Sequence, residues 1–103
     1  MRDKVQVALE ATAEIATTTF GARDQMVKAC EEMGELITQL CKRLNGSPTT
    51  DDKIVDEIAD VLITAHHLRF IYGEEPVDLR VLFKINRTME YIRNLEEKRK
   101  AGL

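Results

Sequence analysis

Apolar and small side chains recur along the chain at intervals of three and four residues, which is the pattern of amphipathic helices. The first such series consists of Val5, Ala8, Leu9, Thr12, Ile15, Ala16 and Thr19. Gly21 then interrupts the pattern. We therefore expect a first helix over residues 5–19. The chain has only two prolines and five glycines, which favours further helices.

The segment after Gly21 predicts a second helix. Asp24 can cap its start, and the helical spacing continues to about Leu44. Residues 45–48 (Asn-Gly-Ser-Pro) would end it, with Gly46 suited to the C-terminal cap. Its apolar positions cover ~180° of the helix surface, which is wider than one core-facing stripe needs. This helix therefore lies either at the centre of its own bundle or at a subunit interface.

Two more helices follow. The candidate N-caps of the third are Thr49, Thr50 and Asp51. It runs to about Tyr72, and residues 73–76 (Gly-Glu-Glu-Pro) form the next break. Pro76 suits the first position of a fourth helix, which runs to about Lys98. Short connections favour antiparallel neighbours, so we expect an all-α fold, an antiparallel four-helix bundle.

The composition fits a single domain over residues 1–103. Apolar residues make up 44% and charged residues 32%, which argues against both a disordered chain and a membrane protein. The 15 Lys and Arg against 18 Asp and Glu give a net charge of −3. Without a basic block, the chain is a poor candidate for binding nucleic acid.

The termini and cysteines suggest a cytoplasmic protein. No apolar segment follows the charged residues 1–4, so we expect no secretory signal and no membrane partner. Cys30 and Cys41 would lie ~16 Å apart on one helix, too far to form a disulfide with each other. Reduced cysteines are typical of the cytoplasm.

Two of the predicted helices each carry a pair of carboxylates. Glu32 and Glu35 lie ~60° apart on the second helix, and Glu57 and Asp60 have the same spacing on the third. The third helix is apolar nearly all round over residues 54–65, and its charges there are all negative. A helix that is apolar all round is a buried helix, and a charge within it must be paired or bind a metal.

A solvated acidic face is the alternative interpretation of these carboxylates. Like charges at this spacing repel by ~0.2–0.5 kcal/mol per pair, and a solubilising face usually includes lysine. We therefore expect the two pairs to converge on a cation. Ligation by oxygen alone suits Mg²⁺, Mn²⁺ or Ca²⁺.

The two histidines do not support a di-iron site. Such a bundle needs Glu-x-x-His on two helices, and neither His66 nor His67 lies three residues after a glutamate. By its angle on the helix, His67 leans towards the acidic pair. Histidines in such positions are more often surface or interface residues.

The fourth predicted helix carries a basic stripe. Arg80, Lys84, Arg87 and Tyr91 share one face. A solvated face is again the alternative. Beside a magnesium site, however, these cations suit phosphate oxygens, which Mg²⁺ and arginine bind together in many sites.

Two acidic motifs carry a resemblance to a known family. Residues 31–35 are Glu-Glu-Met-Gly-Glu, residues 57–60 are Glu-Ile-Ala-Asp, and residues 84–87 are Lys-Ile-Asn-Arg. In these motifs and their spacing the chain resembles the MazG-like family of all-α nucleoside triphosphate pyrophosphohydrolases. The resemblance covers about residues 20–95. It implies cleavage of an NTP or dNTP to the monophosphate and pyrophosphate, with Mg²⁺ as cofactor and Mn²⁺ as a possible substitute.

The resemblance also implies roles for single residues. The metal ligands would be Glu32, Glu35, Glu57 and Asp60. Glu31 would activate or orient the attacking water. The phosphate contacts would be Lys28, Lys84 and Arg87, and possible base or ribose contacts are Gln25 and Asn86. Relatives are usually dimers or tetramers, so we expect a homodimer or homotetramer.

The chain departs from the family in two respects. The family often has paired arginines in the basic segment, whereas Thr88 follows Arg87 here. The chain also lacks tryptophan, so a base-stacking pocket is poorly supplied and the substrate stays open. Two alternatives remain: a hydrolase of the same fold acting on another diphosphate such as phosphoribosyl-ATP, and a non-enzymatic helical binding or scaffold protein with an acidic groove.

Overall fold

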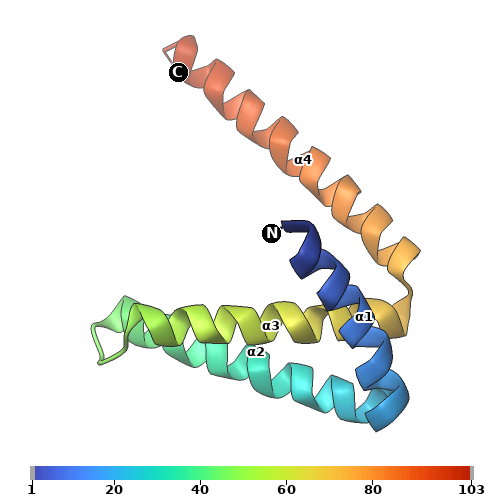
Figure 1. Cartoon of the computed structure of the whole chain (residues 1–103). Coiled ribbons are helices and arrows are strands. Elements are labelled where there is room, and N and C mark those ends of the chain that lie inside the picture. Colours follow the sequence, from blue (N-terminus) through green and yellow to red (C-terminus); the bar gives the residue numbers. More distant parts are fainter. Residues whose placement is uncertain (1, 103) are drawn as a thin grey trace. The chain divides into compact units, whose positions relative to one another are not determined.

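The computed structural model describes residues 2–102, Arg2 by its backbone alone, and contains α-helices and no strand in that range. The helices are α1 (Arg2–Phe20), α2 (Ala22–Asn45), α3 (Asp51–Tyr72) and α4 (Glu74–Lys100) (Figure 1). The predicted all-α class and the number of helices are therefore confirmed. Within the described range, no helix combines the length and the apolar character needed to cross a bilayer.

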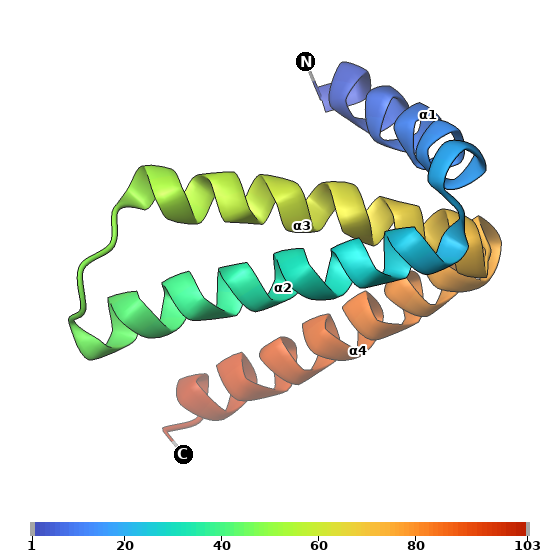
Figure 2. The ribbon, with the colours of Figure 1, turned by 90° about the horizontal axis from the view of Figure 1, so that it is seen from below.

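The chain divides into two units, Met1–Tyr72 with α1–α3 and Gly73–Leu103 with α4, and each is described by itself. In the first unit α2 and α3 lie side by side (Figure 2). Arg43 contacts Asp51 at 2.6 Å beside the connecting loop, and at the other end the Tyr72 hydroxyl donates to the Met26 sulfur at 3.9 Å. These two contacts show that α2 and α3 run in opposite directions.

Two predicted helix boundaries are confirmed by their cap geometry. Gly46 ends α2 in the left-handed conformation, with φ +80°, and donates its N–H to the Lys42 carbonyl. Thr50 caps α3, because its hydroxyl oxygen accepts the Lys53 N–H at 3.2 Å. Tyr72 is the last residue of α3, as the spacing predicted.

The predicted starts of α2 and α4 are wrong, by three residues and by two residues. Asp24 is not a cap: α2 begins at Ala22, and the Gly21 carbonyl accepts the Gln25 N–H. Asp24 instead lies in the first turn, where its charge complements the helix dipole. Pro76 is the third residue of α4 rather than the first, which is tolerated because first-turn N–H groups lack helical partners. The helix also ends at Lys100, beyond the predicted Lys98.

The first unit packs through small side chains. Its buried apolar residues are Ala13 and Ala29, which are 2% and 1% exposed. The prediction that residues 54–65 are buried all round is wrong, since Val55 and Leu62 are 60% and 51% exposed. The reason is that α3 packs against α2 and α1 and leaves part of its surface open.

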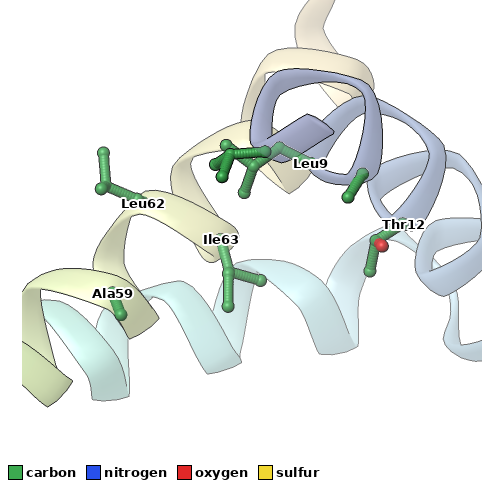
Figure 3. A pocket seen from close by; sticks show the side chains of 7 residues that line it. Leu9, Thr12, Ala59, Leu62 and Ile63 are labelled. Atoms are coloured by element: carbon green, nitrogen blue, oxygen red, sulfur yellow. The ribbon is translucent and has the colours of Figure 1, made fainter. Parts of the chain in front are cut away.

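An apolar pocket of about 350 Å³ separates parts of α1 and α3. Leu9 and Thr12 of α1 line it together with Ala59, Leu62 and Ile63 of α3 (Figure 3). No charged side chain is among the residues that line this pocket.

Candidate metal centre

The predicted carboxylates come together where α2 faces α3. One oxygen from each of Glu32, Glu35, Glu57 and Asp60 lies within 4.8 Å of the others, and we name these four residues the carboxylate cluster. The i,i+3 spacing puts both members of each pair on one helix face, and the pairing of α2 with α3 sets the two faces against each other. Glu32 is buried, two members are half-buried, and Glu35 is exposed.

Two oxygens of the cluster lack any partner. Glu32 is only 6% exposed, and its Oε2 accepts no hydrogen bond within the described residues. Oε2 of Glu57 is also buried and has no hydrogen-bond partner within the described residues. A buried carboxylate oxygen without a partner costs free energy, and a bound cation would supply the missing contact. The residues therefore fit a metal ion.

The raised pKa values of two cluster residues also favour a bound cation. Burial raises the pKa of Glu57, and the neighbouring carboxyl of Glu35 raises it further. Burial also raises the pKa of Asp60, with an added contribution from Glu32. Glu57 and Asp60 therefore resist ionisation, because burial and the neighbouring carboxyl groups both favour the neutral form. A divalent cation would remove that resistance.

Lys28 contacts the cluster from its own helix. Its ammonium lies 3.0 Å from Oε1 of Glu32, and this hydrogen bond raises the pKa of Lys28. The ion pair partly neutralises Glu32 and leaves the other oxygen of that carboxylate without a partner. The predicted contact of Lys28 with phosphate stays a prediction, since in the described structure Lys28 pairs with a candidate metal ligand.

The donors of the cluster are carboxylate oxygens only. This set suits Mg²⁺, Mn²⁺ or Ca²⁺. His67 is not among the four residues, although it is buried and neither ring nitrogen has a hydrogen-bond partner within the described chain. Burial lowers the pKa of His67, which keeps the ring neutral. His67 is therefore a buried, neutral residue of α3 that lies outside the carboxylate cluster.

A polar pocket of about 640 Å³ adjoins the cluster and shares Glu35 and Glu57 with it. Its other lining residues are Glu31, Gly34, Thr38, Gln39 and Lys53. Glu31, which was predicted to activate water, thus lies beside the cluster rather than within it. A ligand in this pocket would touch both the metal ligands and Glu31.

Sequence reasoning missed Gln39 and Lys53 as site residues. A signal for Gln39 was present, because it falls seven residues after Glu32 and so on the same face of α2. The predicted substrate contact Gln25 shares that face and is buried, but it is not one of the residues that line the pocket.

The predicted basic residues lie on α4, in the other unit. There the guanidinium carbons of Arg80 and Arg87 lie 4.8 Å and 5.9 Å from the centre of the Phe83 ring. These distances suit cation–π contacts, which hold the two arginines over the ring. The phosphate roles of Lys84 and Arg87 and the substrate role of Asn86 stay predictions.

Comparison with known proteins adds nothing to this geometry: no protein-family model, curated protein or solved structure matches the chain. The function must therefore be argued from the site and from the two acidic motifs.

Proposed function

We propose that this chain is a Mg²⁺-dependent nucleotide pyrophosphohydrolase that converts an NTP or dNTP to the monophosphate and pyrophosphate. The observation that carries the proposal is the carboxylate cluster, with four oxygens from two helices within 4.8 Å. The resemblance of the two acidic motifs to the MazG-like family supplies the reaction. Mn²⁺ would substitute for Mg²⁺ on the same oxygen ligands.

The members of the cluster would hold the metal. Oε2 of Glu32 and Oε2 of Glu57 have no hydrogen-bond partner in the described part of the chain, which makes them the first oxygens available to it. When bound, Mg²⁺ supplies positive charge that offsets the phosphate charge and polarises the phosphorus–oxygen bonds. Without that charge the cluster would repel a nucleotide.

Glu31 would serve as the base in the proposed reaction. It is exposed and lines the pocket beside the cluster, where the attacking water and the substrate would meet. In the proposed step, a water oxygen bonds to the α-phosphorus while the bond from that phosphorus to the bridging oxygen breaks. The Glu31 carboxylate takes the water proton, and pyrophosphate leaves with the bonding electrons.

The finer architecture belongs to the proposal as well. We infer an antiparallel four-helix bundle that assembles as a homodimer or homotetramer. Large apolar side chains support this, because Leu62 of α3 and both Val81 and Ile85 of α4 are exposed in the described chain. Apolar surface of this extent is usually covered by another surface. Free Cys30 and Cys41 are consistent with a cytoplasmic location.

Two other functions would use the same carboxylates. A hydrolase of phosphoribosyl-ATP would differ only in substrate. A scaffold with an acidic groove would bind a basic protein partner instead. The burial of Glu32 disfavours the scaffold, because an ion reaches a side chain that is 6% exposed far more readily than a lysine of another protein does.

The test is pyrophosphate release in the presence of Mg²⁺ from a panel of NTPs, dNTPs and phosphoribosyl-ATP. We expect release from at least one nucleotide, and a loss of about 100-fold or more in Asp60→Asn, since even residues that only orient a metal ligand cost up to that much. Asp52→Asn, an exposed aspartate on the same helix, is the matched control and should retain full activity.

Equal turnover in wild type and Asp60→Asn would refute the role of the cluster. Release from phosphoribosyl-ATP alone would select the first alternative. Absence of release from every substrate would favour the scaffold.

A further inference from the structure

Gly34 stands in the interior of α2, where nothing in the fold calls for a glycine. Its φ is not in the positive range that four other glycines adopt, and a Cβ built at this position would meet no atom within 4 Å. Glycine destabilises a helix interior relative to alanine. The space over Gly34 is the polar pocket beside the carboxylate cluster. The missing side chain therefore keeps that pocket open.

Gln39 lines the same pocket and has an unused donor. The residue is 6% exposed, and its Oε1 accepts a hydrogen bond from the Thr49 hydroxyl at 2.7 Å. Its amide nitrogen makes no hydrogen bond within the described residues, although the group carries two donor hydrogens. The nearby Thr38 hydroxyl donates to the Gly34 carbonyl at 3.0 Å, so its proton is already used. This amide nitrogen is free to donate to an acceptor on a ligand that enters the pocket.

Lys53 faces this pocket from α3. It is exposed and forms no ion pair among residues 2–102. With a divalent cation on Glu35 and Glu57, the other charged side chains that line the pocket are Glu31 and Lys53. The unused hydrogen-bond donors are then the Lys53 ammonium and the Gln39 amide, and both suit the oxygens of a phosphate group.

We propose that the pocket over Gly34 holds the pyrophosphate portion of the substrate, whose oxygens accept hydrogen bonds from Lys53 Nζ and Gln39 Nε2. This inference rests on the proposed function, because an anion enters only when a cation occupies the carboxylate cluster. It assigns the leaving group to the first unit, where the cluster lies. It also gives Gly34, Gln39 and Lys53 a role in holding that group.

The test is calorimetric titration of inorganic pyrophosphate, in the presence of Mg²⁺, into the full chain and four variants. Gly34→Leu fills the pocket, whereas Gly34→Ala adds one methyl group and serves as its graded control. Lys53→Gln removes the cation, and Lys98→Gln removes an exposed lysine near the end of α4. We expect Gly34→Leu and Lys53→Gln to bind pyrophosphate about 10- to 100-fold more weakly, the range for a lost hydrogen bond to a charged group. Lys98→Gln should match wild type.

Binding of Mn²⁺ alone, followed by electron paramagnetic resonance, separates this inference from the proposed function. Retained Mn²⁺ binding with lost pyrophosphate binding in Gly34→Leu and Lys53→Gln supports the pocket, and also shows that α2 and α3 remain folded. If either variant binds pyrophosphate as wild type does, or if wild type binds Mn²⁺ but no pyrophosphate, the inference is overturned and the metal centre stands. If wild type binds no Mn²⁺, the proposed function itself fails, and this inference fails with it.

Discussion

At the scale of single residues, the carboxylate cluster opposes the folding of the metal-free chain. Burial and neighbouring carboxyl groups raise the pKa of Glu57 and of Asp60. A carboxyl whose pKa is higher in the folded state binds more protons there than in the unfolded state, where its pKa is about 4. The free energy of unfolding therefore rises as the pH falls through the raised pKa towards that value. Above the raised pKa the full destabilisation is present.

This pH dependence of the free energy of unfolding predicts how Glu57→Gln behaves in the absence of divalent cations. The variant should unfold at a higher temperature than wild type at pH 7, because the repelled charge is gone, and its advantage should shrink as the pH falls towards the ordinary glutamate pKa of about 4. Thermal unfolding in the presence of a chelator measures both effects. Asp52→Asn, which removes an exposed aspartate outside the cluster, should show no such advantage. A wild type that equals Glu57→Gln at every pH would contradict the repulsion.

At the scale of helices, the spacing of apolar residues predicted each element, both ends of α3 and the end of α2. Gly46 and Thr50 were predictable because a left-handed cap and a side-chain cap need particular residue types. The starts of α2 and α4 were misplaced because the carbonyls of Gly21 and Gly73 accept the first helical N–H groups, which no side-chain pattern shows. The exposure of Val55 could not be predicted, since it depends on where neighbouring helices lie.

Sequence patterns predicted only part of the candidate site as well. Helical spacing predicted that the carboxylates of the cluster converge, because each pair shares a face of its helix. It did not predict the pocket, since Gln39 is fixed there by Thr49, a residue of the loop between α2 and α3. A loop conformation has no periodic signal in the sequence.

The contact between the helices of the first unit gives a prediction of its own. Ala29 of α2 is 1% exposed, so a larger side chain has no room there. Ala29→Leu should lower the free energy of unfolding by about 1–3 kcal/mol, the usual cost of overpacking. The control is Cys30→Leu at the adjacent, exposed position, which should change the free energy of unfolding by less than about 0.5 kcal/mol. Urea denaturation measures the free energy of unfolding of both variants. If the Ala29→Leu variant is as stable as wild type, the helices are not closely packed at Ala29.

At the scale of the whole molecule, the proposed metal centre would make a divalent cation part of the folded protein. The cluster joins α2 to α3 through four carboxylates that repel one another, and few apolar residues are buried to offset that repulsion. A cation that binds only the folded chain stabilises it by mass action, in proportion to the logarithm of its concentration above the dissociation constant. Folding and cofactor binding should therefore be linked.

Thermal unfolding with and without Mg²⁺, in wild type and in Asp60→Asn, tests this claim most directly. At a Mg²⁺ concentration a hundredfold above the dissociation constant, the gain of about 2.7 kcal/mol corresponds to a rise in Tm of roughly 11–22 °C for a domain of this size. A metal centre at the carboxylate cluster predicts that rise in wild type and its loss in Asp60→Asn. No rise in wild type, or an equal rise in both proteins, would contradict a metal centre at the carboxylate cluster.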